Sequence, residues 1–599
     1  MKIGMHGLLQ ADLAQLAEGA GDPRTLLRLC EAERSKHILL LHSVIAEADR
    51  RFPAAHDELE LAGAWALLNR VQQKAPDILT KVLQMPQLGA WAVDCLLRLG
   101  HVESDSLALR ADLSQAGAFA AVAGVRAGLD FNLPVALPDG LLVLPGLGSL
   151  CTPVRGYARL RHSGVRLELV TGEAAMELPA MRPPSVVARH AGLSIELDVD
   201  SFTPYLDRYR HPRLATVDHR ELRQWSERFA GAWRILAAHH RNDAEAISVS
   251  IRTVVPLQSD RMGSTVAATS PSTFGAVATS LPSDDLTLAE TLVHEFQHLK
   301  LCAVLDLLPL VDSGKGELAY APWRDDPRPS RGLLHGAYAY LGVTRFWRTQ
   351  RWHMPADQAL RGHAEFVRRC AETLGVVKSL LASSRLTAEG ERFVAAAGLQ
   401  LRRWQRDPAP KAARRLALRA SYEHRTTWEA RHTVVDPESV DRLVARWTAG
   451  RSPDVAEWSS VPSWIRSGGV QCSHPRGMLL TLGYVDPPRA RQLLDEEAQG
   501  GPANLGLSKA DAALLGGDLL TAVAAYRSEI RRRPVEPEVW AGLALAVKWS
   551  SDPAAAFLCR RVPLAIALHA AIHNTTGDLT DPLELADWLA NNEPRRRAS

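Results

Sequence analysis

The chain has 599 residues, of which 46% are hydrophobic and 23% charged, and these proportions are ordinary for a globular protein. Its 70 basic and 67 acidic residues give a net charge of +3, which predicts no general affinity for nucleic acid or for a membrane. The length is too great for one hydrophobic core and predicts roughly three to five domains.

The cysteines and the start of the chain bear on cellular location. Seven cysteines are scattered without a CxxC pair, so the sequence predicts neither a disulfide framework nor a thiolate zinc site. The first residues, MKIGMHGLLQADLAQLAEGAG, lack the long apolar run and cleavage site of a signal peptide. No segment approaches the roughly 18 uninterrupted apolar residues of a membrane-spanning helix. We therefore expect a cytoplasmic protein.

The first half of the chain predicts helices, then strands, then a mixture of both. Residues 1–130 are expected to be helical, because Leu, Ala and Val recur at three- and four-residue spacing. Short strands are expected in LPDGLLVLPGLGSL (137–150), VRLELVTG (165–172) and GLSIELDVD (192–200), which Gly, Pro and Asp interrupt. A helix is expected at 221–241, and further strands at 246–257 and 275–281.

A helix that begins near Ser283-Asp284-Asp285 carries the most informative motif, His294-Glu295-Phe296-Gln297-His298. Histidines four apart on a helix lie one above the other, so both imidazoles can bind one metal ion. Imidazole suits zinc, iron, copper and nickel, so the pair alone does not select the metal. Apolar residues at helical spacing (Ala289, Leu292, Val293, Phe296 and Ala303, with Lys300 among them) predict that this helix is buried.

A metal site needs a third protein ligand, and two residues are candidates. Glu317 follows His298 at a spacing close to that of glutamate-ligated zinc peptidases, but it lies in a Gly-containing loop. His335 opens the next expected helix, at 333–352, between Gly332 and Gly336, which leave room for close approach. We favour His335 as the third ligand and keep Glu317 as the alternative.

The irregular segment before His335 is rich in arginine and proline. PWRDDPRPSRG (322–332) contains Arg324, Arg328 and Arg331, and prolines stiffen it. It is either a surface loop with internal pairing to Asp325 and Asp326, or a rigid guanidinium site for a carboxylate near the metal. A simple peptidase does not need such a site, whereas an enzyme with a dicarboxylate cosubstrate does.

The rest of the chain is expected to be mostly helical. Residues 512–547 predict two helices joined at Pro534 and resemble one tetratricopeptide-type unit. The sequence as a whole predicts a predominantly helical α+β protein with a zincin-like HExxH helix in a central mixed region. We expect four regions: helical 1–130, an α+β metal-binding core at 131–350, helical 351–450, and helical 451–599.

Three segments together resemble a known family. They are GAVATSLPSDDLTLAETLVHEFQHLKLCAVLDLLPLV (275–311), YAPWRDDPRPSRGLLHGAYAYLGVTRFW (320–347) and HRTTWEARHTVVDPESVDRLVARWTAG (424–450). The chain looks like the HExxH-motif proteins that modify ribosomally synthesised peptides, described as 2-oxoglutarate-dependent peptide β-hydroxylases. The matching blocks lie within roughly 245–450.

The resemblance implies Fe(II), 2-oxoglutarate and O₂, and hydroxylation of a side-chain Cβ in a precursor peptide. It implies that His294 and His298 bind iron, with His335 as our choice of third ligand, and that Arg324 or Arg328 binds the distal carboxylate of 2-oxoglutarate. Iron with few protein ligands keeps positions open for a bidentate keto acid and for oxygen. Another peptide-modifying enzyme is a further candidate partner, and the helical flanks are expected to hold a leader peptide or that partner.

Two alternatives remain open at this point. Glu295 would be the catalytic general base of an HExxH zinc metallopeptidase, whereas in a hydroxylase it would orient a ligand or the substrate. The chain could also be a non-catalytic helical scaffold.

Overall fold

The computed structural model divides the chain into two compact units, Met1–Leu310 and Val311–Ser599. It describes residues 5–101, 105–137, 139–179, 181–206, 212–214, 216–259, 265–312, 314, 317–451, 453, 455–466, 474–498, 505–552 and 554–590. The boundary between the units, after Leu310, falls inside the region 131–350, which the sequence predicts to be one core. The division into four regions stays a prediction.

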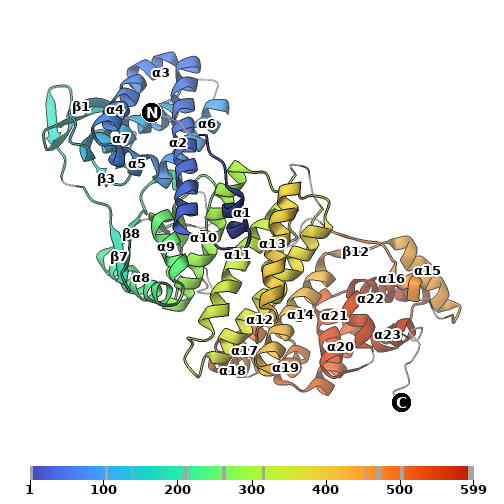
Figure 1. Cartoon of the computed structure of the whole chain (residues 1–599). Helices are drawn as coiled ribbons and strands as arrows, with labels where there is room; N and C mark the ends of the chain where they lie inside the picture. The colour runs from blue at the N-terminus through green and yellow to red at the C-terminus, as the bar shows by residue number, and fades with distance from the viewer. Residues whose placement is uncertain are drawn as a thin grey trace. The chain divides into compact units, whose positions relative to one another are not determined.

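Along the sequence, the first unit begins with helices, continues with strands and ends with a mixture of helices and short strands (Figure 1). Its helices are α1 (Gln10–Ala17), α2 (Pro23–Arg51), α3 (Pro53–Glu58), α4 (Leu61–Lys74), α5 (Pro76–Leu83), α6 (Pro86–His101), α7 (Leu107–Arg126), the 3₁₀ turn η1 (Pro204–Leu206), α8 (His219–His239), α9 (Arg241–Ser250) and α10 (Asp285–Leu307). Its strands are β1 (Phe131–Leu137), β2 (Leu141–Leu144), β3 (Gly148–Cys151), β4 (Gly156–Ser163), β5 (Arg166–Thr171), β6 (Ala174–Glu177), β7 (Ser185–His190), β8 (Leu193–Val199), β9 (Thr253–Pro256), β10 (Ala267–Ala268) and β11 (Ala276–Thr279).

The first helices and the first sheet share one hydrophobic core. An antiparallel sheet with the order β1-β4-β5-β6 places alternate residues such as Leu133 and Val135 against α4 and α7. The helices contribute residues from the same cluster, including Leu67 and Phe119. The predicted switch from helices to strands near residue 130 is confirmed, because α7 ends at Arg126 and β1 begins at Phe131.

A second, mixed sheet positions the HExxH helix. Its order is β10-β11-β9-β8-β7, with β9 parallel to both neighbours. It contacts α8, α9 and α10, and β11 leads directly towards α10. The strand expected at 246–257 is only partly correct: residues 246–250 belong to α9, and the strand β9 starts at Thr253.

The α9 helix forms because tertiary packing overrides the β-branched residues of this segment. Ala244, Ala246 and Ile247 are buried on α9, which packs against α2 and β8. Arg241 and Glu245 form an ion pair one helical turn apart, with Nε and Oε1 2.9 Å apart.

The α10 helix begins where the sequence predicts. Asp284 is its N-cap, and the Asp284 carboxylate accepts hydrogen bonds from the backbone N–H and the hydroxyl of Thr287, both at 2.8 Å. Residues 288–304 of this helix are buried except for Glu290, Thr291, His294 and His298, which are half-buried. The helix is therefore enclosed on nearly all sides and opens along one stripe.

The second unit is almost entirely helical. Its helices are α11 (Ser330–Gln350), α12 (Ala359–Ala382), α13 (Ala388–Trp404), α14 (Lys411–His432), α15 (Pro437–Thr448), α16 (Val455–Ser459), α17 (Pro475–Val485), α18 (Pro487–Ala498), α19 (Lys509–Gly516), α20 (Leu519–Arg532), α21 (Pro537–Trp549), α22 (Ala555–Thr576) and α23 (Pro582–Ala590). A small antiparallel pair, β12 (Thr433–Val435) and β13 (Ser463–Ile465), lies between them in sequence.

The C-terminal helices of this unit share their core with α14 and α15. The α14 helix packs against α21 and α22, and one hydrophobic cluster includes Ala430, Leu443, Trp540 and Leu568. The α20–α21 pair is the helical hairpin that the sequence predicts, although residues 512–516 belong to the separate helix α19.

A buried arginine joins the same elements through polar contacts. Arg476, on α17, is fully buried and forms ion pairs with Glu423 of α14 and Asp511 of α19, at 3.2 and 2.7 Å. Its guanidinium also donates a hydrogen bond to Thr427. These contacts tie α17 and α19 to α14 in the interior of the second unit.

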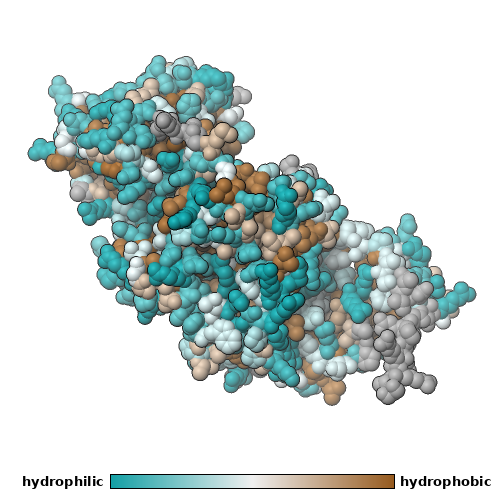
Figure 2. All heavy atoms as spheres, in the orientation of Figure 1, coloured by the Kyte–Doolittle hydropathy of each residue, from teal (hydrophilic) through white to brown (hydrophobic). Residues whose placement is uncertain are grey.

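The prediction of a predominantly helical α+β protein is confirmed. Across the described segments, no helix has the length and apolar character needed to cross a membrane. On the face shown in Figure 2, hydrophobic residues are scattered among hydrophilic ones in both units, as on ordinary globular proteins. Six cysteines are described and are free thiols, while Cys472 lies outside the described residues.

Candidate functional sites

His294 and His298 lie on the open stripe of α10, one turn apart. The Nε2 atoms of the two rings are 3.2 Å apart, and the ring centroids are 4.9 Å apart with the planes at 73°. The side chain of His294 is 24% exposed, so solvent reaches the pair although the helix around it is buried. The structure thus places both imidazoles on the same side of the helix, as the sequence predicts.

The spacing of the two nitrogens fits a shared metal ion. Two nitrogens each about 2.1 Å from one ion are roughly 3.0–3.4 Å apart for bond angles between the octahedral and tetrahedral values. The Nε2–Nε2 distance of 3.2 Å lies in this range. The two nitrogens can therefore occupy two adjacent coordination positions of a zinc or iron ion.

Glu295 is buried beside the histidine pair. Its side chain is 4% exposed, and its Oε1 lies 3.9 Å from Nε2 of His294. Burial raises the pKa of Glu295 to about 8, although a hydrogen bond from the side chain of Thr269 lowers it. No described residue donates a hydrogen bond to its Oε2. Without a metal nearby, this carboxyl group holds its proton at neutral pH.

The buried face of α10 is anchored to the start of the chain. Gln297 and Lys300 donate hydrogen bonds of 3.0 Å to the carbonyl of Gly19, and Lys300 also donates to the carbonyl of Ala20 at 2.9 Å. These carbonyls follow the end of α1. The Lys300 ammonium is 5.0 Å from the centroid of the Phe296 ring, so it also interacts with an aromatic face. The unexpected lysine in the apolar stripe thus has a structural role.

No third ligand is assigned to the histidine pair. Among the described residues, no group of three or more His, Cys, Asp or Glu side chains forms a metal-binding cluster. The two candidates, His335 and Glu317, belong to the second unit, where Glu317 is exposed and His335 is half-buried. Their roles stay predictions.

The surroundings of His335 differ from the sequence expectation in one respect. The space beside Gly336 is filled, because a Cβ atom there would come within 2.2–2.4 Å of the Trp323 ring. Trp323 is itself stacked on Tyr340, with centroids 4.7 Å apart. The glycine accommodates this indole, which corrects the expectation that it leaves room near a metal. Burial, with Arg331 and Arg328 nearby, lowers the pKa of His335 to about 4, so its imidazole is neutral.

Arg324 and Arg328 are held by one carboxylate. Asp326 lies 2.6 Å from Nε of Arg324 and 3.1 Å from Nη1 of Arg328. Burial raises the pKa of Asp326, but the two guanidinium groups outweigh it and lower the pKa overall. The loop therefore contains the internal pairing that the sequence offered as one alternative. Binding of 2-oxoglutarate by either arginine stays a prediction.

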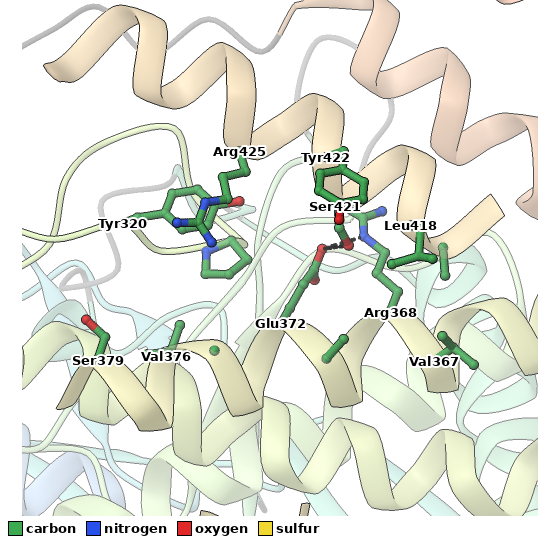
Figure 3. Close-up of a pocket in the computed structure, with 14 residues that line it drawn as sticks. Tyr320, Val367, Arg368, Glu372, Val376, Ser379, Leu418, Ser421, Tyr422 and Arg425 are labelled. Carbon is green, nitrogen blue, oxygen red and sulfur yellow. Dashed lines mark hydrogen bonds and ion pairs between the residues drawn. The ribbon is translucent and has the colours of Figure 1, made fainter. Parts of the chain in front are cut away.

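The second unit also contains a cavity that the sequence did not indicate. It has a volume of about 260 Å³ and lies between α12 and α14, with Tyr320 at one end (Figure 3), and Pro322 also lines it. Val367, Ala371, Gly375 and Ser379 lie four residues apart on α12 and line it. This run of mostly small residues at helical spacing was the available signal, but helix packing interfaces show the same pattern.

Tyr320 connects this cavity with the arginine loop. Its hydroxyl is 2.8 Å from Nδ1 of His424, and Nε2 of His424 is 3.7 Å from Asp325. Burial raises the pKa of Tyr320 well above its usual range. The hydroxyl therefore keeps its proton while it shares a hydrogen bond with His424.

Comparison with known proteins adds no relative. No protein-family model matches the chain, and no curated protein has significant similarity to it.

Proposed function

We propose that the chain is an Fe(II)- and 2-oxoglutarate-dependent hydroxylase of peptide side chains, with His294 and His298 as iron ligands. The observation that carries the proposal is the pair of Nε2 atoms 3.2 Å apart on the open stripe of an otherwise buried helix. The family resemblance supplies the choice of iron over zinc. When bound, iron with 2-oxoglutarate and O₂ supplies the oxidation of a C–H bond to an alcohol.

The protein's own residues have separate roles in this proposal. His294 and His298 present ring nitrogens from a rigid helix, which fixes their geometry before an ion arrives. Glu295 holds its buried carboxyl group next to His294, with Oε1 3.9 Å from the His294 Nε2, where it can orient a ligand or the substrate. His335 as third ligand, and Arg324 or Arg328 as the 2-oxoglutarate arginine, rest on the resemblance.

A zinc metallopeptidase is the second candidate, and the position of Glu295 favours it. A carboxylate 3.9 Å from a ligand nitrogen is close enough to contact a metal-bound water. The raised pKa of Glu295 argues against a general base at neutral pH, because a protonated carboxyl cannot accept the proton of water. A bound cation would lower this pKa, so the metal must be tested directly.

The test is anaerobic titration of the purified chain with Fe(II) and then with 2-oxoglutarate. We expect saturable iron binding, a weak visible charge-transfer band with 2-oxoglutarate, and succinate release when O₂ is admitted. His298→Ala should abolish all three, because the ligands that remain cannot hold the ion. His190→Ala is the matched control, since His190 is an exposed histidine of the same unit and should leave them unchanged.

Glu295→Gln separates the two candidates. In a hydroxylase this variant should retain metal and the charge-transfer band. In a peptidase, zinc-dependent cleavage of casein should fall by about 10²–10⁴-fold when the base is removed. Absence of the charge-transfer band together with such cleavage would reject the hydroxylase, and failure to retain any transition metal would reject both.

A further inference from the structure

We propose that the cavity between α12 and α14 binds a peptide segment in which a large apolar side chain is flanked by acidic residues. The cavity belongs to the second unit alone, so this inference does not depend on the metal proposal. Its volume of about 260 Å³ is just below the roughly 300–1,000 Å³ of pockets that enclose drug-sized ligands. It therefore suits an anchoring side chain better than a whole cofactor.

The interior of the cavity favours an apolar group. Val376, Ala417 and Leu418 contribute apolar surface, and a Cβ atom at Gly375 would meet no atom within 4 Å, so space remains there for a side chain of the occupant. Figure 3 shows that the buried charges in the wall interact with each other instead of presenting an unpaired charge to the cavity.

The two buried charged side chains of the wall, Arg368 and Glu372, find their partners within the protein. Arg368 donates from Nε to Glu372 at 2.9 Å and from Nη1 to Thr481 and Tyr484. Glu372 also accepts from the Ser421 hydroxyl at 2.7 Å. Since these charges are mutually compensated, a ligand needs no buried ionic group, and burial of apolar surface supplies the binding energy.

The mouth of the cavity is positively charged. Each of its two tyrosines has a cation over the ring: Arg425 lies 5.8 Å from the centroid of Tyr320, and Lys548 lies 4.2 Å from that of Tyr422. The α14 helix, which forms one wall, carries six basic and two acidic residues. One of those acids, Glu423, is buried against Arg476, and the other, Glu429, pairs with Arg425. Arg431 is paired with Glu538, so the net positive charge of this wall comes from the other basic residues of α14 together with Lys548, and it favours acidic residues beside the apolar anchor.

The open side of the cavity favours a peptide over a free small molecule. Gly375, Ser379 and Tyr422 line it and are exposed, so an occupant continues into solvent instead of being enclosed. The lining of α12 from Val367 to Ser379 extends about 18 Å. This is the length of five to six residues of an extended peptide. We therefore assign a short acidic segment with one apolar anchor.

Fluorescence anisotropy of the full chain with dye-labelled hexapeptides tests the proposal. The probes carry a central Leu, Phe or Trp flanked by Asp, and matched sets replace Asp with Lys or the anchor with Ser. We expect saturable binding of at least one acidic apolar probe, weakened by added salt, and binding at least about 10-fold weaker for both matched sets.

Gly375→Leu is the decisive variant. A side chain at this position meets no atom within 4 Å, so leucine should fill the cavity without strain and weaken probe binding at least about 10-fold. Gly483→Leu is the control, since Gly483 is also a helical glycine of this unit with open space beside it, but it does not line the cavity.

Charge at the mouth is tested separately with the double variant Arg425→Gln/Lys548→Gln, which should weaken binding of the acidic probes and reduce its salt dependence.

Equal binding of the probes to Gly375→Leu and to the unmodified chain would overturn the proposal. It would also be overturned if the Lys probes bound as well as the Asp probes, if no probe bound at millimolar concentration, or if free octanoate bound in the cavity while no peptide did.

Discussion

One buried glutamate of the first unit, Glu33, costs the folded state free energy when its carboxyl group ionises. Glu33, on α2, is 3% exposed, and its carboxylate lies 2.5 Å from Nζ of Lys36. Burial nevertheless outweighs the lysine and raises the pKa of Glu33 to about 7. Ionisation of Glu33 above this pH therefore costs free energy in the folded state despite the ion pair.

Glu33→Gln should make the stability of the protein less dependent on pH. The folded carboxyl has a pKa near 7, above its ordinary value of 4.5, so its contribution to stability is full below pH 4.5 and is lost as the pH rises to about 7. This loss is at most about 3 kcal/mol. Urea unfolding between pH 4.5 and 8 should show the decline in the unmodified chain and a flatter profile in the variant.

Glu47→Gln provides the control for this experiment. Glu47 lies on the same helix, and its hydrogen bonds with Arg50 lower its pKa, the opposite direction. This variant should keep the decline between pH 4.5 and 7. A Glu33→Gln profile that declines as steeply as that of the unmodified chain would contradict the assignment.

Among single residues, the sequence identified those whose roles are local. The His294–His298 pair and the Asp284 cap depend only on helix geometry, and the structure places both as expected. Lys300 could not be interpreted in this way, because its acceptors, the carbonyls of Gly19 and Ala20, lie about 280 residues earlier in the chain. The Asp326 contacts of Arg324 and Arg328 are local, and the sequence offered this pairing as an alternative.

At the scale of elements, two helical glycines of the second unit have opposite surroundings. A Cβ atom at Gly336 on α11 would overlap Trp323, whereas one at Gly375 on α12 would meet no atom within 4 Å. The sequence alone does not distinguish them, since both lie inside regular helices. The cavity and the packing of the 320–329 segment depend on this difference.

Gly336→Ala should destabilise the second unit by about 1–3 kcal/mol, because the Trp323 ring is stacked on Tyr340 and cannot move aside without loss. The matched variant Gly375→Ala should be stabilising by up to about 1 kcal/mol, since it gains helix propensity at no steric cost. Chemical unfolding monitored by circular dichroism measures both. Equal effects of the two substitutions would contradict the packing described for Trp323.

The α9 helix shows why one element was predicted incorrectly. Residues 246–250 include Ile247 and Val249, which favour a strand when considered alone. The segment is helical because this conformation buries Ala246 and Ile247 where α9 packs against α2 and β8. These elements are distant in sequence, so local propensity does not reveal them.

At the scale of the whole molecule, hydrophobic texture indicated where helices give way to strands but not which helices share a core. The structure groups buried residues of α14 and α15 with those of α19 to α23 in one cluster, across the boundary at 450 that the sequence predicts. A boundary read from composition cannot detect a buried ion pair such as Arg476–Glu423.

A chain ending at residue 450 should therefore lose the folded second unit. Glu423 would keep its place on α14 without Arg476, and apolar residues such as Ala430 and Leu443 would lose their partners. Loss of one partner of a buried ion pair alone costs about 3–5 kcal/mol. We expect the fragment 311–450 to be protease-sensitive and poorly helical by circular dichroism, whereas 311–599 should be cooperative and protected. A 311–450 fragment that is protected and unfolds cooperatively would contradict the conclusion that α14 and α15 share a core with the helices after residue 450.

The contact of Tyr320 with His424 has a practical consequence for spectroscopy. Tyr320 lines the cavity, and its backbone neighbour Ala319 exchanges two hydrogen bonds with Arg328, closing a short hairpin that contains Trp323. The Tyr320 ring also packs edge-on against the indole of Trp428, with ring centroids 5.1 Å apart, so any occupant that displaces the phenol would disturb the surroundings of Trp428. Trp428 thus gives the second unit an intrinsic optical reporter, readable as the emission difference from Trp428→Phe without attaching a dye.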